Sequence, residues 1–214
     1  MSDKATGGNG VELTERDPGR VNAFSDGVTA IAVTLLILEV QPPDNPRNLW
    51  HALASLWPSY LAYVMTFMLI GQIWANHHVM FDHIRHVDRA GLLLNTLLLM
   101  DIAFLPFAAS VLASALRDGH DLRTAVVFHG LAFTLAALLF NALWAHARHR
   151  RRLLANTITP EGAATIARRF QLALAWLATG TILGAIVPAL GLALIGAFVI
   201  YYWFPIPGEI GRAA

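Results

Sequence analysis

The stretch Arg20-Val-Asn-Ala-Phe-Ser-Asp-Gly-Val-Thr-Ala-Ile-Ala-Val-Thr-Leu-Leu-Ile-Leu-Glu39 decides the fold class of this chain. From Val28 to Leu38 it is apolar apart from two threonines, which predicts a membrane-spanning helix from about Phe24 to Val40. The triplet at its start contains Asp26. A carboxylate inside such a helix is expensive in a bilayer, so Asp26 is a candidate functional residue.

The composition of the whole chain agrees with a membrane protein. Of its 214 residues 56% are hydrophobic and 14% are charged, with a mean hydropathy of +0.53. Soluble domains average about 25% charged residues. The absence of cysteine excludes disulfides, thiolate metal sites and cysteine nucleophiles. We predict a disordered cytoplasmic arm over residues 1–19, a single transmembrane domain over 20–205 and a short cytoplasmic tail over 206–214.

Further apolar segments predict an all-α integral membrane protein with six transmembrane helices per subunit. A proline-rich loop, Gln41–Pro46, ends the first span. The next spans are predicted over Trp50–Trp74, Gly91–Leu116 and Leu122–Ala147. The last apolar run, from Phe170 to Phe204, is about twice a minimal span. Gly184, Pro188 and Gly191 lie in its middle, so we divide it into two spans joined by a tight turn.

The distribution of Lys and Arg supports six spans and an orientation. With six spans, 12 of the 15 Lys and Arg residues lie on the side of both termini and three on the other side. The positive-inside rule then places both termini in the cytoplasm of a multi-pass plasma-membrane protein. The basic run Arg148–Arg152 is expected to fix this topology and to contact anionic lipids, and nucleic-acid binding is not expected beside a span.

A helical wheel divides the first predicted helix into two faces. Asp26, Val33 and Ile37 fall opposite Ile31, so the carboxylate and Ile31 cannot face the same environment. One face can line a pore while the other packs on the subunit, or the apolar stripe is ordinary helix packing. The residues on the side of Ile31 are Phe24, Gly27, Thr34, Leu35 and Leu38.

The pattern of this helix resembles a known family. Arg20, Phe24-Ser25-Asp26-Gly27-Val28 and Thr34-Leu35-Leu36 are similar to the signature helix of the bacterial branch of the transmembrane protein 175 family, which are potassium-permeable channels. Trp74, His77-His78, Asp88, Asn95 and Phe104-Leu105-Pro106-Phe107 extend the resemblance, which covers about half of the chain, from Arg20 to Phe107.

The resemblance implies a homotetrameric cation channel rather than an enzyme. Potassium would be the permeant ion, with no cofactor. Four copies would each contribute the first helix to the pore, with Ile31 forming the narrowest ring and Thr34, Leu35 and Leu38 lining the wall. No Thr-Val-Gly-Tyr-Gly carbonyl filter occurs, so selectivity would come from side chains.

Several polar residues outside the pore stripe are candidates for a supporting network. Arg20, Trp74 and His77 are predicted partners of Asp26, because a buried carboxylate needs a donor or a counter-charge. With Phe24 and Ser25 they form a predicted structural or gating network. Asp101 is predicted to be a structural carboxyl bonded to Asn95 or another span, with a proton relay as the alternative.

Two other classes of function remain as alternatives. Asp26 and Asp101 are compatible with a small proton- or cation-coupled transporter, although no internal repeat is visible. The cluster His77, His78, Asp82, His83 and His86 is compatible with a membrane metalloenzyme. On a continuous helix His78, Asp82 and His86 would share a face, but no known zinc-protease pattern occurs and we do not predict a bound metal.

Overall fold

The structure is a computed structural model, and it describes residues 18–44 and 47–203. The predicted arm up to residue 17, residues 45–46 of the proline-rich loop and the predicted tail lie outside the described residues. In order, the elements are α1 (Pro18–Leu35), η1 (Leu36–Glu39), α2 (Leu49–Ser55), α3 (Trp57–Phe81), α4 (Arg89–Asp118), α5 (Leu122–His149), η2 (Arg151–Leu153), α6 (Pro160–Ile186) and α7 (Pro188–Trp203).

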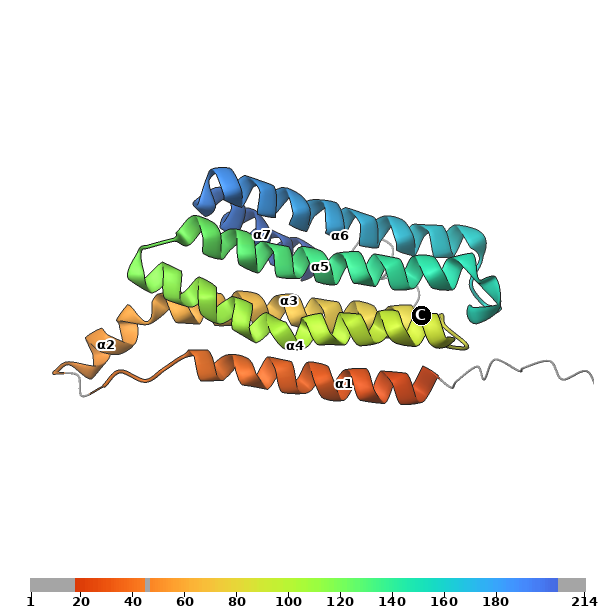
Figure 1. Cartoon of the computed structure of the whole chain (residues 1–214), viewed down its shortest axis with the longest axis horizontal. Coiled ribbons are helices and arrows are strands. Elements are labelled where there is room, and N and C mark those ends of the chain that lie inside the picture. The colour runs from red at the N-terminus through yellow and green to blue at the C-terminus, as the bar shows by residue number, and fades with distance from the viewer. Residues whose placement is uncertain (1–17, 45–46, 204–214) are drawn as a thin grey trace, which may run out of the picture.

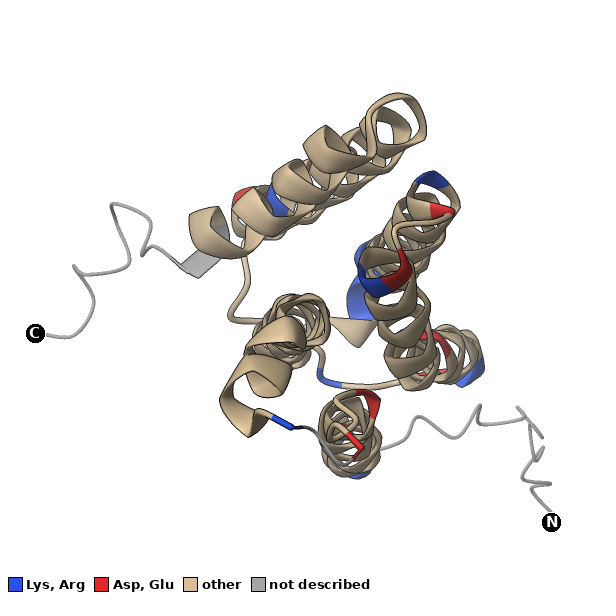
Figure 2. Cartoon of the chain, turned by 90° about the vertical axis from the view of Figure 1, so that its left-hand side faces the viewer, with Lys and Arg blue, Asp and Glu red and all other residues tan. Residues whose placement is uncertain are grey.

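The long helices form one bundle and lie roughly along a common direction (Figure 1). α1 packs against α3 and α4, while α5 joins α4 to α6, and α7 folds back beside α6. Seen along the bundle, α1 is the helix at the lower edge, and α6 is at the opposite edge (Figure 2). The first helix is therefore peripheral within a single subunit.

Local sequence signals explain where the helices start and stop. The side chains of Asn48, Asp88 and Thr159 each accept a hydrogen bond from the backbone N–H three residues later, at the starts of α2, α4 and α6. Gly119 ends α4 in the left-handed region, with φ 70°, which glycine adopts without steric cost.

The predicted division of the last apolar run is confirmed. α6 ends at Ile186, and Pro188 begins α7. Proline suits the first turn of a helix, where its missing N–H is not needed. The hairpin closes tightly because Gly184 and Gly191 face each other, and a Cβ on Gly191 would collide with the Gly184 backbone.

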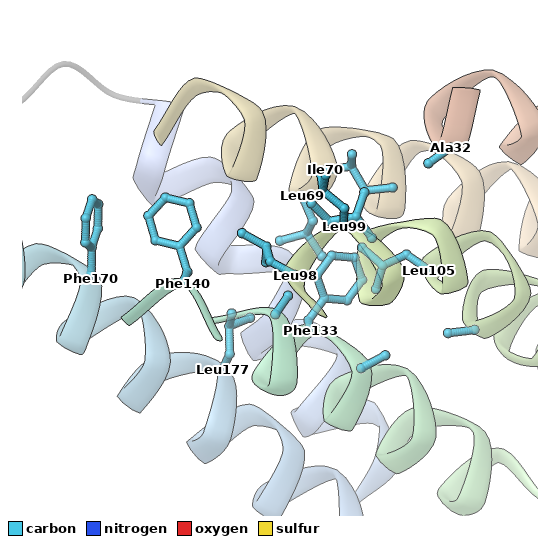
Figure 3. Close-up of a cluster of buried hydrophobic side chains, with 14 of the residues drawn as sticks. Ala32, Leu69, Ile70, Leu98, Leu99, Leu105, Phe133, Phe140, Phe170 and Leu177 are labelled. Atoms are coloured by element: carbon cyan, nitrogen blue, oxygen red, sulfur yellow. The ribbon is translucent and has the colours of Figure 1, made fainter. Parts of the chain in front are cut away.

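The core between the helices is apolar and continuous (Figure 3). Ile70 of α3, Leu98 and Leu105 of α4 and Phe133 of α5 are all at most 1% exposed. The side chains that α1 buries in this core are small, and Ala32 is 1% exposed. Small side chains let helices approach closely in a membrane, where packing rather than the hydrophobic effect drives helix association.

Length and hydropathy alone do not confirm all six predicted spans. Among the described residues, four helices (α1 with η1, α4, α5 and α6) are long and apolar enough to cross a membrane, and a fifth span exists if α2 and α3 are one bent span. α2 and α3 meet at a 48° bend, whereas the sequence predicted one helix there. α7 is a shorter apolar helix.

Three helix boundaries also differ from the prediction. α1 begins at Pro18, inside the segment predicted to be disordered, because Pro18 can serve as a first-turn residue. α3 continues through His77 to Phe81, since the rings of His77 and Phe81 stack on each other along the helix. α6 begins at Pro160, ten residues before the predicted start, after the Thr159 cap.

Candidate functional site

The two faces of α1 have opposite surroundings in the structure. Its inner face is buried against α3 and α4 through Val21, Ser25, Thr29 and Ala32. Its outward face is left bare by the rest of the subunit. Ile31 is 61% exposed, and the other exposed side chains of this face are Phe24, Thr34, Leu35 and Leu38. The helical wheel therefore predicted correctly which residues of α1 share the exposed face with Ile31.

The outward face continues past the end of the α-helix. Leu36 is fully buried, and the chain tightens there into the 3₁₀ turn η1. Because a 3₁₀ turn advances each residue farther round the axis than an α-helix, the wheel does not hold beyond Leu35. Ile37, predicted on the side of Asp26, is 53% exposed as a result. Val33 stays partly buried against the core, as its wheel position predicted.

The inner face of α1 is held by a directional chain of hydrogen bonds. The His77 ring nitrogen Nε2 lies 2.9 Å from Asn95 Oδ1, which can only accept, so His77 donates. Asn95 Nδ2 donates to Ser25 Oγ at 3.1 Å, and Ser25 Oγ donates to the Val21 carbonyl at 2.9 Å. Ser25, His77 and Asn95 are each at most 4% exposed. This chain ties α1 to α3 through a side chain of α4.

Aromatic rings enclose the His77 end of this chain. The imidazole stacks on Phe81 with ring centroids 4.3 Å apart and meets the edge of Phe140 at 6.4 Å. A polar group buried among rings costs free energy unless its hydrogen bonds are made. Asn95 is therefore the residue on which the buried polar network depends.

Asp26 occupies a different position from the one expected. Its carboxylate is not buried in the bundle but is 43% exposed, at the edge between α1 and α3. Trp74 Nε1 donates to Asp26 Oδ1 at 3.0 Å, as predicted. The nearby histidine is His78, with Nδ1 3.8 Å from Asp26 Oδ1, and not His77. His77 turns inward because it lies about 100° away from His78 on the helix.

Arg20 is not brought to Asp26 in the subunit. It is exposed on the first turn of α1, and its side chain makes no hydrogen bond or ion pair with another described residue. Six residues separate Arg20 from Asp26 along α1, which is about 9 Å along the helix axis. Of the three predicted partners, the structure brings only Trp74 into contact with the carboxylate.

The hydroxyls of α1 bond mainly to their own helix. Thr29 Oγ1 donates to the Ser25 carbonyl at 2.8 Å on the buried face. Thr34 Oγ1 donates to the Ile31 carbonyl at 2.9 Å on the exposed face. A hydroxyl that donates inward keeps its oxygen lone pairs available. Thr34 is thus an acceptor on an otherwise apolar face.

The histidine-rich segment after α3 does not gather into a metal-binding cluster. Over residues 18–44 and 47–203, no three His, Asp or Glu side chains converge to hold a metal ion. α3 ends at Phe81, so His78, Asp82 and His86 do not share a helical face. Asp88 is used elsewhere, as the cap of α4.

Asp88 also joins the predicted cytoplasmic loops. Its Oδ1 accepts from His146 Nε2 at 2.9 Å, and Arg150 lies 3.8 Å from Oδ2. Burial raises the pKa of Asp88, but the Gly91 N–H, His146 and Arg150 outweigh it and hold the pKa below its ordinary value of 3.8. We call these contacts of Asp88 with His146 and Arg150 the clasp. Beside the clasp, the backbone of Ile84 pairs with that of Leu154.

Asp101 is not bonded to Asn95 as expected. Asn95 uses its amide on Ser25 and His77, and Asp101 Oδ2 has no hydrogen-bond partner among the described residues. The sequence did not predict the roles of Asn95 and His78 or the contact between Asp88 and His146. Asparagine deep in an apolar span was the available signal for the first of these.

Comparisons with known proteins agree with this architecture. The sequence model of the family described as the endosomal/lysosomal potassium channel TMEM175 matches residues 20–106. A protein of Streptomyces collinus named as a potassium channel is 40% identical over 196 residues, covering 89% of this chain and 95% of that protein. The chain belongs to the TMEM175 family.

Solved structures and other relatives extend this result. The crystal structure of a lysosomal potassium-selective channel TMEM175 homologue from Chamaesiphon minutus matches with a TM-score of 0.77 and 34% identity, over 86% of this chain and 95% of that one. The human protein named endosomal/lysosomal proton channel TMEM175 is 36% identical over 135 residues, 58% of this TMEM175-family chain. That alignment spans 27% of the human protein.

Proposed function

We propose that four copies of this chain form a potassium-permeable cation channel around an axis lined by α1. The observation that carries the proposal is the bare outward face of α1, which the subunit leaves uncovered from Phe24 to Leu38. The related bacterial proteins named as potassium channels support potassium as the permeant ion. No cofactor or catalytic group is needed for this function.

The proposed subunit has six spans with both termini in the cytoplasm. α2 and α3 together make the second span, bent by 48°. α7 makes the sixth; its 16 residues extend about 24 Å along the axis. An even number of spans places both termini on one side, and the excess of Lys and Arg there assigns it to the cytoplasm of a plasma-membrane protein.

Permeation would be limited by a ring of Ile31 side chains. Four branched apolar side chains around an axis make a narrow, dry ring that an ion cannot cross with its full hydration shell. Leu35 and Leu38 continue the apolar wall, and Thr34 offers oxygen lone pairs one turn beyond the ring. Partial dehydration costs less for potassium than for the smaller sodium ion, which would give a moderate potassium preference.

The polar residues around α1 would set its position and its gating. The chain from Ser25 through Asn95 to His77 fixes the inner face of α1, and the Asp26–Trp74 bond fixes its edge. Phe24 lies next to these residues on the outward face. Arg20, exposed at the predicted cytoplasmic end, would contact lipid phosphates, as would the run Arg148–Arg152.

Electrical recording from purified protein in planar bilayers tests the proposal. With potassium on one side and sodium on the other, unitary currents that reverse toward the potassium potential are expected. A second recording, with a proton gradient and no permeant metal cation, decides whether protons cross as well. The reason for this test is that the human relative is named a proton channel. A saturable flux without unitary currents would instead identify a transporter.

A further inference from the structure

A groove of about 560 Å³ runs between α4 and α5 on the outside of the subunit. One of its lining residues, Asp101, is 6% exposed, and its Oδ2 has no hydrogen-bond partner in the part of the chain that the structure describes. Ionisable side chains within membrane spans almost always face protein or a polar cavity rather than lipid. This surface is therefore expected to be covered by protein. Its main apolar lining residues are Met100, Phe104, Phe128, Leu131 and Leu135.

A second uncovered apolar surface lies on the other side of α1. We call it the outer face of α3. Its large members protrude, and Val64 is 54% exposed; the other exposed or partly exposed residues of this face are Leu61, Phe67, Met68, Gly71 and Ala75. α1 contacts both α3 and α4, and these two helices lie on its two sides (Figure 2). The outer face of α3 and the groove beside α4 therefore belong to opposite sides of α1.

Rotational symmetry then determines which surfaces can meet. This step rests on the proposed function, in which each copy turns the outward face of α1 to a common axis. In such a ring every contact joins two different surfaces, one from each side of α1. We infer that the outer face of α3 of one subunit docks on α4 and its groove in the next subunit.

The depths of the two surfaces in the membrane match. His77 of α3 bonds Asn95 of the antiparallel α4, which sets those residues at one level. Six residues further along each helix, about 9 Å, Asp101 is level with Gly71. Gly71 and Ala75 let a neighbouring helix approach closely at this level, as small residues do in membrane interfaces. The bulky Val64 is in turn level with Phe107, which is 54% exposed.

Disulfide cross-linking tests this interface on a clean background, because the chain contains no cysteine. The double variant Val64→Cys with Phe107→Cys is oxidised in membranes with copper phenanthroline and separated on a non-reducing gel. Linked dimers, trimers and tetramers are expected. Each single variant stays monomeric on the gel, because equal positions are far apart in the ring. A second pair, Phe67→Cys with Phe104→Cys, repeats the test one turn away.

A matched control replaces Phe107 by an apolar residue of α6 that is at least as exposed. Ile182 is 64% exposed and lies at about the depth of Phe107, since Thr66 bonds His129 and the adjoining Gly130 touches Thr181. Val64→Cys with Ile182→Cys should not cross-link; linking there instead would overturn the inference.

Native mass spectrometry separates this inference from the proposed function. If tetramers form but neither the Val64–Phe107 pair nor the Phe67–Phe104 pair cross-links, the inferred interface is wrong and the proposed channel function is unaffected. Monomers without unitary currents would overturn both.

Discussion

The two faces of α1 differ in what holds them. The inner face is buried and carries Ser25, whose hydroxyl belongs to a hydrogen-bond chain that reaches α4 and α3. The outward face carries Ile31 and Leu38, both at least 60% exposed in the subunit. One helix thus has a side that fixes its place in the fold and a side that the fold leaves free.

This division separates two kinds of sensitivity to mutation. Substitutions on the inner face leave buried polar groups without partners, which costs folding free energy. Substitutions on the outward face change side chains that the subunit core does not contact, so they alter the wall of the proposed pore and not the fold of the subunit. Stability and conduction should therefore respond to different residues of the same helix.

The largest effect is expected from Asn95→Ala. It leaves His77 Nε2 without an acceptor, which costs about 1–3 kcal/mol, and it removes one of the two hydrogen bonds of Ser25 Oγ, which costs about 0.5–1.5 kcal/mol. We expect a loss of about 1.5–4.5 kcal/mol of stability, measured as a fall in the thermal unfolding midpoint in detergent. Thr96→Ala is the control, because Thr96 is exposed and bonds only to its own helix at Leu92. Similar midpoints for the two variants would show that the polar chain does not hold α1.

A change of conduction is expected from Ile31→Ser. The hydroxyl wets the proposed ring and lowers the barrier to a dehydrating ion. Roughly a tenfold rise in single-channel current, equivalent to about 1.4 kcal/mol, is expected, with weaker discrimination between potassium and sodium. Val33→Ala, on the partly buried side of α1, should leave the current unchanged. Equal effects at both positions would place the constriction elsewhere.

Asp26→Asn tests the edge between the two faces. The amide oxygen can still accept from Trp74 Nε1, so only the charge assistance is lost, about 1 kcal/mol of stability. Cation-over-anion selectivity in bilayer recordings should not change, because the carboxylate sits against α3. If selectivity collapses while the assembly stays intact, the carboxylate faces the permeation path.

The smallest effect is expected at Asp88, whose contacts with His146 and Arg150 join α4 to the end of α5 and not to α1. The lowered pKa of Asp88 means that its ionised form stabilises the fold above its unfolded pKa of about 3.8, and this contribution is lost as pH falls through the lower folded pKa. The gap in unfolding midpoint between the parent and Asp88→Asn should shrink as the pH falls below about 3.8. Asp82→Asn, at an exposed position, should show no gap. A gap that grows as the pH falls below 3.8 would contradict the assignment.

Helical periodicity predicted the faces of α1 because the angle between residues depends only on local backbone geometry. Ile31, Leu35 and Leu38 fall together on any α-helix or its short 3₁₀ extension, whatever surrounds it. The same local rules predicted the break before Pro188, where a helix can start but not continue. The bend between Ser55 and Trp57 carried the same signal, because Pro58 lies in the first turn of α3, although one continuous span was predicted there.

Composition, periodicity and charge placement by themselves determined that this is an α-helical membrane protein whose first helix has two unlike faces. Only the tertiary structure decided that His78 rather than His77 lies by Asp26, that Asn95 links Ser25 to His77, and that Asp101 Oδ2 has no hydrogen-bond partner among the described residues. Such pairings depend on how far each helix is rotated and shifted against its neighbours. Those two quantities are set by side-chain packing across helices, which no single helix encodes.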